Sequence, residues 1–330
     1  MRPRTGMALA TVPSEPHVRD WARVLQTDVH HVTAYRKNYR LETGQGTWIA
    51  KKIEHVERMR WWLEVDRYMR TQGFRSMPIP LMGGQWLLTP FVPGTIASYA
   101  NREHITATMV ELGRFHRMGR CIAVPPFASK PFLLYRRVYH RLSQFYRLLR
   151  RSTTMDGELG ELLQTYGRPF YLDGFKAWQR LLRLPLRSWV DEAHASRQIA
   201  HRDLASHNWM IDAIGQPWLI DFETAEYDCQ LGDVWQMVAR MLAENQWERG
   251  MLGLALGAYL QERPLAPWEE KVLVLLLSFP NEFFREAIGL ASRRRGYHMR
   301  YALPYLQRLA STRKKWKEQT RVWLAGEDLF

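Results

Sequence analysis

The sequence predicts an α+β fold made of two lobes, a small N-terminal lobe with an antiparallel sheet and one packed helix and a larger, mainly helical C-terminal lobe. Short strand-like runs separated by turns are concentrated before residue 92, whereas the chain after residue 93 shows helical apolar spacing over most of its length. A segment at 89–94 flanked by Pro and Gly separates the two patterns and is the expected hinge. We therefore expect lobes at 1–92 and 93–330, with a cleft between them.

The composition indicates a folded protein with a large core and a basic surface. Of the 330 residues, 46% are hydrophobic and 14 are Trp, which is ample for one large or two medium domains. The 47 Lys and Arg residues against 33 Asp and Glu give a formal net charge of +14. Such a charge favours phosphate-bearing ligands, nucleic acid or anionic surfaces as partners without distinguishing them.

Cysteine usage and the length of the apolar runs exclude several classes of protein. Cys121 and Cys229 are the only cysteines and neither belongs to a C-x-x-C pair, so a disulfide scaffold or a cysteine-rich metal site is not expected. Pro13 and Pro16 interrupt the N-terminus before a long apolar core develops, which is not typical of a signal peptide. The longest apolar runs, such as 272–277, are far shorter than the roughly 20 residues that span a bilayer. We expect a soluble, cytoplasmic protein without a membrane span.

The predicted N-terminal lobe begins with an amphipathic helix and continues as a three-stranded meander. The turns of this meander contain Lys37-Asn38 and Gly44-Gln45-Gly46. A longer helix follows, with Trp62 and Met69 at helical spacing, and it ends at Gly73. The expected ranges are helix 17–26, strands 32–35, 39–42 and 47–53, helix 56–72, and a further strand segment at 85–89.

The predicted C-terminal lobe is a succession of amphipathic helices around a polar motif at 198–223. Its helix at 131–151 is rich in Arg and aromatic residues, and a loop is expected at 152–160. The last helix, at 300–324, carries the basic run 313–317. Further helices are expected at 108–119, as two patterns within 162–187, and at 231–242, 251–260, 269–279 and 282–292.

The motif at 198–223 places three polar residues where loops and short strands would bring them together. His201-Arg202-Asp203 and Asn208 fit the H-R-D-x-x-x-x-N catalytic-loop pattern of kinases, and Asp221 stands in Ile220-Asp221-Phe222-Glu223, at a DFG-like position. Between Asn208 and Asp221 we expect a hairpin, with strands at 209–211 and 218–220 around a turn at 213–217. This hairpin would place Asn208 and Asp221 side by side.

These residue types suit phosphoryl transfer. Carboxylate and amide oxygens are natural ligands for Mg²⁺, so Asn208 and Asp221 are the expected metal ligands. Asp203 stays free of metal and is the expected catalytic base, which orients an acceptor hydroxyl and takes its proton. A single Asp or Asn in a loop is usually a turn residue or a helix cap. Turn chemistry does not require all three at this spacing.

The motif and several flanking segments resemble the protein-kinase-like fold in its small-molecule branch, the aminoglycoside and choline phosphotransferases. The narrower resemblance is to kinase-like spore-coat proteins of the CotS type from endospore-forming bacteria. The resemblance implies ATP held between the lobes, two Mg²⁺ ions, and transfer of the γ-phosphate to a hydroxyl. The narrower one implies spore-coat proteins as partners and the spore coat as a location. The flanking segments that carry the narrower resemblance are Tyr39-Arg40-Leu41-Glu42-Thr43, Ile49-Ala50-Lys51-Lys52-Ile53, Gln72-Gly73-Phe74 and Leu112-Gly113-Arg114-Phe115-His116-Arg117.

The resemblance assigns the nucleotide-binding lysine to Lys51 or Lys52. Successive strand side chains face opposite ways, so only one of the two can point into the cleft, and we favour Lys51. Its helix partner would be Glu64, with Glu57 as the alternative.

The same resemblance assigns further roles on both sides of the cleft. The backbone of 89–92, with Thr89, Phe91 and Val92, would bind adenine. Asp233 would brace the catalytic loop, and His201 is assigned a structural rather than a catalytic role.

Several departures from the family pattern bear on activity and substrate. No G-x-G-x-x-G lies between the first two predicted strands, where Arg36-Lys37-Asn38 stands instead, so side-chain charge would have to replace the backbone amides that usually cover phosphates. Glu223 stands where the DFG motif has glycine, and it could bind metal or face solvent.

The connection between Asp221 and Asp233 bears on the substrate. It is short and lacks A-P-E, which favours a small-molecule acceptor over a protein. Arg202 has no evident partner.

Three functions remain after these observations. The intact set of Asp203, Asn208 and Asp221 favours an ATP-dependent phosphotransferase that acts on a hydroxyl of a small molecule, whereas the missing Gly-rich loop favours a kinase-like structural or binding protein, such as a spore-coat component, with little or no turnover. The basic segments 131–151 and 313–317 could bind nucleic acid, but solvated faces of amphipathic helices give the same pattern, so no specific nucleic-acid binding is expected. Arginines of 131–151 could instead line the acceptor pocket and select an anionic substrate.

Overall fold

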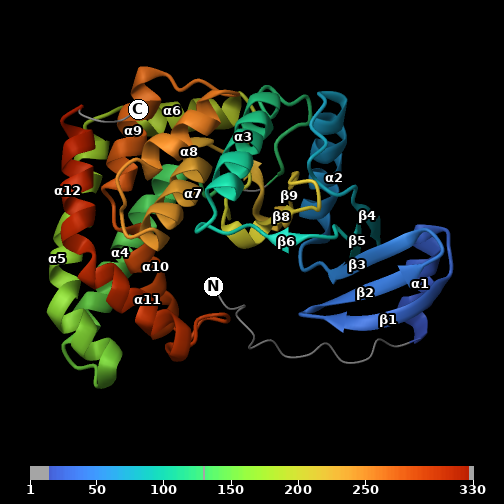
Figure 1. The fold of residues 1–330 in the computed structure, drawn as a ribbon, viewed down its shortest axis with the longest axis horizontal. Helices are drawn as coiled ribbons and strands as arrows, with labels where there is room; N and C mark the ends of the chain where they lie inside the picture. The colour runs from blue at the N-terminus through green and yellow to red at the C-terminus, as the bar shows by residue number, and fades with distance from the viewer. Residues whose placement is uncertain (1–14, 129–130, 327–330) are drawn as a thin grey trace.

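Residues 15–128 and 131–326 are described by the computed structural model, which shows an antiparallel sheet at the N-terminal end and a mainly helical remainder (Figure 1). This confirms the predicted α+β fold, with a small sheet-bearing part and a larger helical part. The segment before residue 15, where we expect no signal peptide, lies outside the described residues.

The N-terminal sheet has five antiparallel strands in the order β1-β2-β3-β5-β4, and the predicted meander forms its first three. Helix α1 packs on one face, where Trp21 is fully buried in a small core with Leu41, Ala50 and Leu88. Because side chains alternate along β3, Lys51 lies on the face opposite to Ala50. The elements are α1 Glu15–Leu25, β1 Val29–Tyr35, β2 Asn38–Thr43, β3 Gly46–Lys52, β4 Leu81–Gly83 and β5 Trp86–Pro90.

Helix α2 (Val56–Thr71) connects the sheet with the main core of the molecule. Its apolar residues Met59, Trp62 and Met69 belong to the large core that the C-terminal helices share, rather than to the small core under α1. The helix ends at the expected place, where Gly73 adopts a positive φ of 94° and Phe74 donates its N–H to the carbonyl of Met69 at 3.0 Å.

The chain passes from the sheet to the helical part at the segment predicted to be the hinge. After β5, strand β6 (Thr95–Ile96) pairs with β8 (Trp209–Ile211), which in turn pairs with β9 (Pro217–Leu219). This confirms the predicted hairpin, with its second strand one residue earlier than expected. A Cβ on Gly94 would lie 2.1 Å from the carbonyl oxygen of Ile211, so the crossing segment can approach β8 this closely only because residue 94 is glycine.

The remaining helices form the larger part of the molecule, with α5 and α12 farthest from the sheet in Figure 1. Helix α3 begins at Asn101, whose side-chain oxygen accepts the N–H groups of Glu103 and His104 at 2.8 and 3.2 Å. The helices are α3 Arg102–Met118, α4 Leu134–Ser152, α5 Gly157–Leu182, α6 Leu186–Ala195, α7 Leu231–Glu244, α8 Met251–Leu260, α9 Pro267–Leu277, α10 Asn281–Ala291, α11 Met299–Ser311 and α12 Arg313–Leu324.

Two helix predictions differ from the structure. The expected loop at 152–160 is shorter, because α5 begins at Gly157 and runs without a break through Pro169, where two helical patterns were expected. Its continuous buried face, with Leu163, Phe170 and Leu181, outweighs the local cost of the proline. The predicted final helix is two helices, since α11 ends and α12 begins around Thr312, whose hydroxyl donates to the carbonyl of Arg308 at 2.8 Å.

The basic run 313–317 is packed against the helical part. Arg313 and Lys317 both contact the buried carboxylate of Asp173 on α5 at 2.5 Å, and Trp316 is buried and donates its indole N–H to the carbonyl of Leu277 at 2.9 Å. At least these two cations of the run therefore have an internal partner. Over 15–128 and 131–326, no helix is long and apolar enough to cross a membrane.

Candidate active site

The predicted catalytic loop is held from below by one buried carboxylate. Asp233, in the first turn of α7, accepts the backbone N–H of His201 at 2.6 Å with Oδ2 and that of Arg202 at 2.7 Å with Oδ1. Arg202 has a positive φ of 71°, an uncommon conformation for a residue with a Cβ. The two hydrogen bonds to a fully buried carboxylate maintain it.

His116 from α3 completes this support. Its Nε2 lies 3.3 Å from Asp233 Oδ2 and its Nδ1 lies 2.8 Å from the hydroxyl of Tyr259. Burial lowers the pKa of His116 although Asp233 opposes this, so the ring is neutral near pH 7, with its proton on Nε2 donated to Asp233. Burial alone would raise the pKa of Asp233, but the hydrogen bond from His116 and the backbone N–H groups hold it below its usual value.

Asp203 and Asn208 are fixed by the loop itself. The amide nitrogen of Asn208 donates to the backbone carbonyl of Asp203 at 2.7 Å, so the amide oxygen Oδ1 is the end that can bind a cation. The carbonyl of Asn208 accepts the N–H of Ile220 at 3.0 Å, next to the β8–β9 hairpin. The side chain of Asp203 is 52% exposed, and its Oδ1 lies 3.9 Å from the guanidinium of Arg240. The loop therefore presents the Asp203 carboxylate to solvent while its backbone is held.

Asp221 follows the hairpin at a sharp bend. Its φ and ψ of 70° and 63° lie in the left-handed region, and the preceding carbonyl of Ile220 is 3.0 Å from Nε2 of His201. The hairpin thus places Asp221 next to the segment that carries Asn208, as expected from the sequence. A non-glycine residue in this conformation at the end of a buried strand is a feature often found at functional sites.

Lys51 reaches Asp221 across the boundary between the sheet and the helical part. Its Nζ lies 2.7 Å from Asp221 Oδ1 and 2.9 Å from Glu223 Oε1. Burial alone would lower the pKa of Lys51, but the two carboxylates outweigh it and raise the pKa. Burial would likewise raise the pKa of Asp221, and Lys51 instead holds it lowered. Lys52, next along β3, is exposed.

The predicted helix partner of Lys51 does not reach it. Glu64 is exposed on α2, and Glu57 pairs with Arg60 at 2.7 Å, so the carboxylates at Lys51 come from the segment after β9 instead. The helical pattern of α2 identified its apolar face correctly, but the sequence does not indicate which polar residue faces the neighbouring strand. Glu223 contacts Lys51 and is thus not a purely solvent-facing residue.

Arg58 on α2 contacts the same segment, which sequence reasoning missed. Its guanidinium donates to the carbonyls of Glu223 and Ala225 at 3.2 and 2.6 Å and contacts the Glu226 carboxylate at 3.2 Å. On the same helix, Trp62 stacks on Phe222 with ring centroids 4.2 Å apart. Polar and aromatic contacts therefore tie helix α2 to the segment after Asp221.

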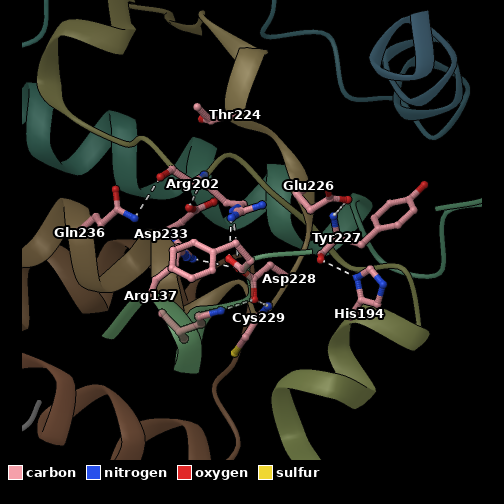
Figure 2. Close-up of polar contacts among 12 residues, drawn as sticks. Arg137, His194, Arg202, Thr224, Glu226, Tyr227, Asp228, Cys229, Asp233 and Gln236 are labelled. Atoms are coloured by element: carbon pink, nitrogen blue, oxygen red, sulfur yellow. Dashed lines mark hydrogen bonds and ion pairs between the residues drawn. The ribbon is translucent and has the colours of Figure 1, made fainter. Parts of the chain in front are cut away.

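Arg202 has a partner, contrary to the expectation from the sequence. Asp228 is fully buried, and Arg137 from α4 and Arg202 from the catalytic loop both contact its Oδ2, at 3.0 and 3.6 Å (Figure 2). Arg202 also donates to the carbonyl of Phe132 at 2.7 Å. Burial, followed by the nearby charge of Arg137, lowers the pKa of Arg202 to about 10. No motif singles out Asp228, because its partners are distant in the sequence.

The turn that replaces the glycine-rich loop brings positive charge to the site. Arg36 and Lys37 form the two-residue connection between Tyr35 and Asn38, and Arg36 has a positive φ of 59°, where hairpins usually have glycine. The charge of Lys37 contributes to the lowered pKa of Asp221. Lys37 and Lys51 therefore both act on Asp221 from the sheet.

The segment predicted to bind adenine runs out of β5. Thr89 pairs with Ile49 of β3, and the N–H of Phe91 donates to the carbonyl of Thr47 at 2.9 Å. Val92 is half-buried at the crossing between the two parts.

The oxygen ligands at this site suit Mg²⁺ better than a metal whose ligands all come from the protein. Asp221 offers a carboxylate and Asn208 an amide oxygen, both hard ligands, and Mg²⁺ usually takes one or two protein ligands together with water and substrate phosphates. Within the described ranges there is no group of three or more His, Cys, Asp and Glu residues able to hold a metal.

Comparisons with known proteins agree with this geometry. Residues 32–268 match the model of the phosphotransferase enzyme family (APH). This range covers most of the sheet, the crossing segment, the catalytic loop and α7.

Solved structures of small-molecule kinases share the fold. An aminoglycoside phosphotransferase from Alicyclobacillus acidocaldarius superposes with a TM-score of 0.81 at 16% identity, covering 98% of this chain and 100% of that one. The spectinomycin phosphotransferase APH(9)-Ia, in complex with ADP and spectinomycin, gives 0.65 at 9% identity over 94% and 99% of the two chains. The choline kinase LicA from Streptococcus pneumoniae gives 0.56 at 13% identity over 92% and 99%. With the family model spanning most of the chain, this protein belongs to the phosphotransferase enzyme family.

Proposed function

We propose that the protein transfers the γ-phosphoryl group of ATP, as its Mg²⁺ complex, to a hydroxyl group of a small molecule. The observation that carries the proposal is the contact of 2.7 Å between Lys51 and Asp221, which joins the two parts of the molecule beside the loop of Asp203 and Asn208. ADP bound to the spectinomycin phosphotransferase of the same fold supports a nucleotide as the phosphoryl donor. The roles of individual residues in this reaction are part of the same proposal.

The sheet provides the cations for the phosphates of the nucleotide. Lys51 is held close to Asp221, where its ammonium group would contact the α- and β-phosphates. Lys37, whose charge already acts on Asp221, would cover the phosphates from the β1–β2 turn. Its side-chain charge takes the role that backbone N–H groups have in a glycine-rich loop.

The crossing segment provides the contact with adenine. Pro90 and Pro93 have no N–H, and the N–H of Phe91 already donates to the carbonyl of Thr47. Val92 is therefore the residue of this stretch whose N–H we assign to adenine. Thr89 and Phe91 contribute by shaping the strand end that positions it.

Asp221 and Asn208 Oδ1 would hold Mg²⁺, which neutralises charge on the β- and γ-phosphates when it is bound. The Lys51 ammonium group contacts Asp221 Oδ1. The other carboxylate oxygen, Oδ2, can bind the metal only while Lys51 stays at Oδ1. Glu223 gives Lys51 a second carboxylate. This second contact keeps the ammonium group in place when Asp221 binds the metal.

Asp203 would position the acceptor and take its proton. The acceptor oxygen forms a bond to the γ-phosphorus while the bond from that phosphorus to the β–γ bridging oxygen breaks, ADP leaves, and the hydroxyl proton passes to the Asp203 carboxylate. The connection from Asp221 to Asp233 is short and tied to β7 (Ile199–Ala200) by β10 (Glu226–Tyr227). This leaves no extended segment for peptide docking, so the acceptor is a small molecule.

The test measures nucleotide binding and phosphoryl transfer separately. We expect MgATP to stabilise the wild-type protein by about 2.7 kcal/mol at 100 times its Kd, measured by thermal unfolding. Asp221→Asn should weaken MgATP at least tenfold while leaving metal-free ATP little changed. Asp203→Asn should leave MgATP binding intact and reduce γ-phosphate release, to water or to an added alcohol, by roughly 10²–10⁴-fold.

A different result would favour the non-catalytic alternative. If MgATP neither stabilises the protein nor loses its γ-phosphate, and Asp221→Asn changes nothing, the protein is a kinase-like structural or binding protein. A component of the spore coat is the form of that alternative suggested by the sequence resemblance. None of the contacts at Lys51, Asp203 or Asp221 favours it over a phosphotransferase.

A further inference from the structure

A buried cluster of charged side chains lies behind the Asp203 carboxylate. It is formed by α4, α7 and α10, and α10 packs on both of the other helices. None of its members belongs to the motif that identifies the catalytic loop. The cluster, named here the acceptor-side cluster, consists of Arg141, Arg240, Glu282, Arg285 and Glu286.

The two carboxylates of the acceptor-side cluster are already engaged by one arginine. Nη2 of Arg285 lies 2.6 Å from Glu282 Oε2 and 2.6 Å from Glu286 Oε1. Burial alone would raise the pKa of Glu282, but Arg285 and then Arg240 hold it lowered, so it is ionised. The two carboxylates therefore more than balance the positive charge of Arg285 within the cluster.

Arg240 connects the cluster to the catalytic loop. Its guanidinium lies 3.7 Å from Glu282 and 3.9 Å from Asp203, and it also donates to the carbonyl of Leu204. Its side chain is 11% exposed. Arg240 thus lies between the buried carboxylates and the proposed catalytic base.

Arg141 is the member of the cluster without a partner. It lies on the face of α4 that carries Val138 and Phe145, and Phe145 stacks on Phe284 of α10 at 4.0 Å. Its guanidinium makes no hydrogen bond or ion pair with any residue of 15–128 or 131–326. Burial, followed by the like charge of Arg285, lowers its pKa to about 10, although the nearby charge of Glu282 opposes this. Arg141 is half-buried, and a cation that has no hydrogen-bonded counter-ion in such a place is costly for a folded protein.

A cavity adjoins the cluster through Tyr297. The hydroxyl of Tyr297 lies 3.1 Å from Nη1 of Arg285, and Tyr297 also lines a cavity of about 340 Å³. The same cavity is lined by the consecutive arginines 293–295 and by His298. The space beyond the cluster is therefore positively charged as well.

We propose that the acceptor is a hydroxylated anion, whose carboxylate or phosphate group binds Arg141 while its hydroxyl group meets Asp203. This inference rests on the proposed phosphotransferase function. An anionic group supplies the directly bonded counter-ion that Arg141 lacks, and a guanidinium can bind a carboxylate or phosphate through two parallel hydrogen bonds. Arg240, between Glu282 and Asp203, keeps the acceptor's anionic group from being repelled by these carboxylates. A neutral or cationic acceptor would leave the half-buried Arg141 without a directly bonded counter-ion.

The first experiment compares hydroxyl compounds that share a carbon skeleton and differ in whether they carry a carboxylate, a phosphate or no charge. Binding is measured by titration calorimetry with MgADP present, for glycerol, glycerate and glycerol 3-phosphate, for glucose, gluconate and glucose 6-phosphate, and for choline as a cation. We expect at least one anionic compound to bind roughly 10- to 100-fold more tightly than its neutral partner. The carboxylate and phosphate members distinguish the two sources of the anionic group.

The second experiment repeats the binding with variants of α4. Arg141→Gln should abolish the preference for the anion and leave the neutral compounds unchanged, whereas Arg141→Lys should retain part of it. Arg150→Gln removes an exposed arginine of the same helix. It should change neither the preference for the anion nor the binding of the neutral compounds. Arg141→Gln should also be at least as stable as the wild type without ligand, because it removes a half-buried charge that makes no ion pair and lies near the like charge of Arg285; a purely structural arginine would give a less stable variant.

The outcomes separate this inference from the proposed function. The inference is wrong if no anionic compound binds more tightly than its neutral partner, or if the preference persists in Arg141→Gln. It is also wrong if choline binds most tightly. If MgATP binds and is turned over in any of these cases, the phosphotransferase function stands although the inference about the acceptor fails. If the anions bind through Arg141 but no phosphate is transferred, the site stands and the proposed function fails.

Discussion

On the C-terminal side of the proposed site, Asp203 and Asn208 are held through backbone hydrogen bonds to buried groups, whereas on the N-terminal side Lys51 and Lys37 reach it as single charged side chains. The loop of Asp203 is fixed by Asp233, which is fully buried and accepts two N–H groups. Lys51 extends from a strand whose neighbouring residue Ala50 is buried in a separate small core. The two sides therefore belong to different packing units.

Because of this difference, substitutions on the two sides of the site should affect stability and ligand binding differently. A change under the catalytic loop leaves buried donors without an acceptor, so it affects folding and catalysis together. A change in the lysines of the sheet removes charge at the end of a flexible side chain. It should affect nucleotide binding far more than folding.

The largest effect is expected for Asp233→Asn. In the wild type, each carboxylate oxygen of Asp233 accepts one backbone N–H, from His201 or Arg202. The Asn side chain replaces one of these oxygens by an NH₂ group, which cannot accept a hydrogen bond, so one backbone N–H loses its acceptor. We expect the free energy of unfolding to fall by roughly 2–4 kcal/mol. The same variant should lose phosphoryl transfer, because the loop of Asp203 loses its support. Chemical denaturation and turnover of MgATP measure the two losses.

The matched control is the same substitution in the β8–β9 hairpin. Asp212 accepts the N–H groups of Ile214 and Gln216 and the indole N–H of Trp218 at 2.9–3.0 Å, but it lies at an exposed turn. Asp212→Asn should therefore change stability much less than Asp233→Asn and leave turnover unaffected. Equal losses in the two variants would contradict the special role assigned to the buried carboxylate.

An intermediate effect, on binding rather than folding, is expected for Lys51→Met. Loss of its contact with the phosphates should weaken ATP by roughly 10- to 100-fold, measured by calorimetric titration. Lys52→Met is the control, because Lys52 is exposed on the other face of β3 and should change ATP affinity by less than about twofold. If Lys52→Met weakens ATP as much as Lys51→Met does, the assignment of the cleft-facing lysine is wrong.

The sequence predicted the α+β architecture and the hairpin of the motif well because both depend on local patterns. Strand alternation required that only one of Lys51 and Lys52 point towards the helical part, and burial of Ala50 under α1 explains why it is Lys51. The hairpin that joins Asn208 to Asp221 could be predicted from two short apolar runs around a turn. These signals are all contained within a few neighbouring residues.

Contacts between distant segments could not be predicted in the same way. The exposed Glu64 shows that a helical pattern identifies the buried face of α2 but not the partner of each charged residue. The partner of Arg202 is Asp228, which Arg137 of α4 also contacts, and only the packing of α4 on the catalytic loop brings the three together. The break at Thr312 carries no Gly or Pro that would have indicated it.

The smallest effect concerns the pH dependence of the support under the catalytic loop. Burial lowers the pKa of His116 below its ordinary value of 6.5, so between its folded pKa and about 6.5 the unfolded chain binds more protons than the folded one. Stability therefore rises with pH in this window and falls as the solution becomes more acidic, by no more than about 1.4 kcal/mol per pH unit from this group. In His116→Gln the side-chain amide can still donate to Asp233, but the group no longer titrates. The free energy of unfolding, measured from pH 7.5 to 5, should thus depend less steeply on pH for this variant. An unchanged slope would contradict the lowered pKa of His116, and a steeper slope would mean that His116 is protonated in the folded protein, paired as a cation with Asp233.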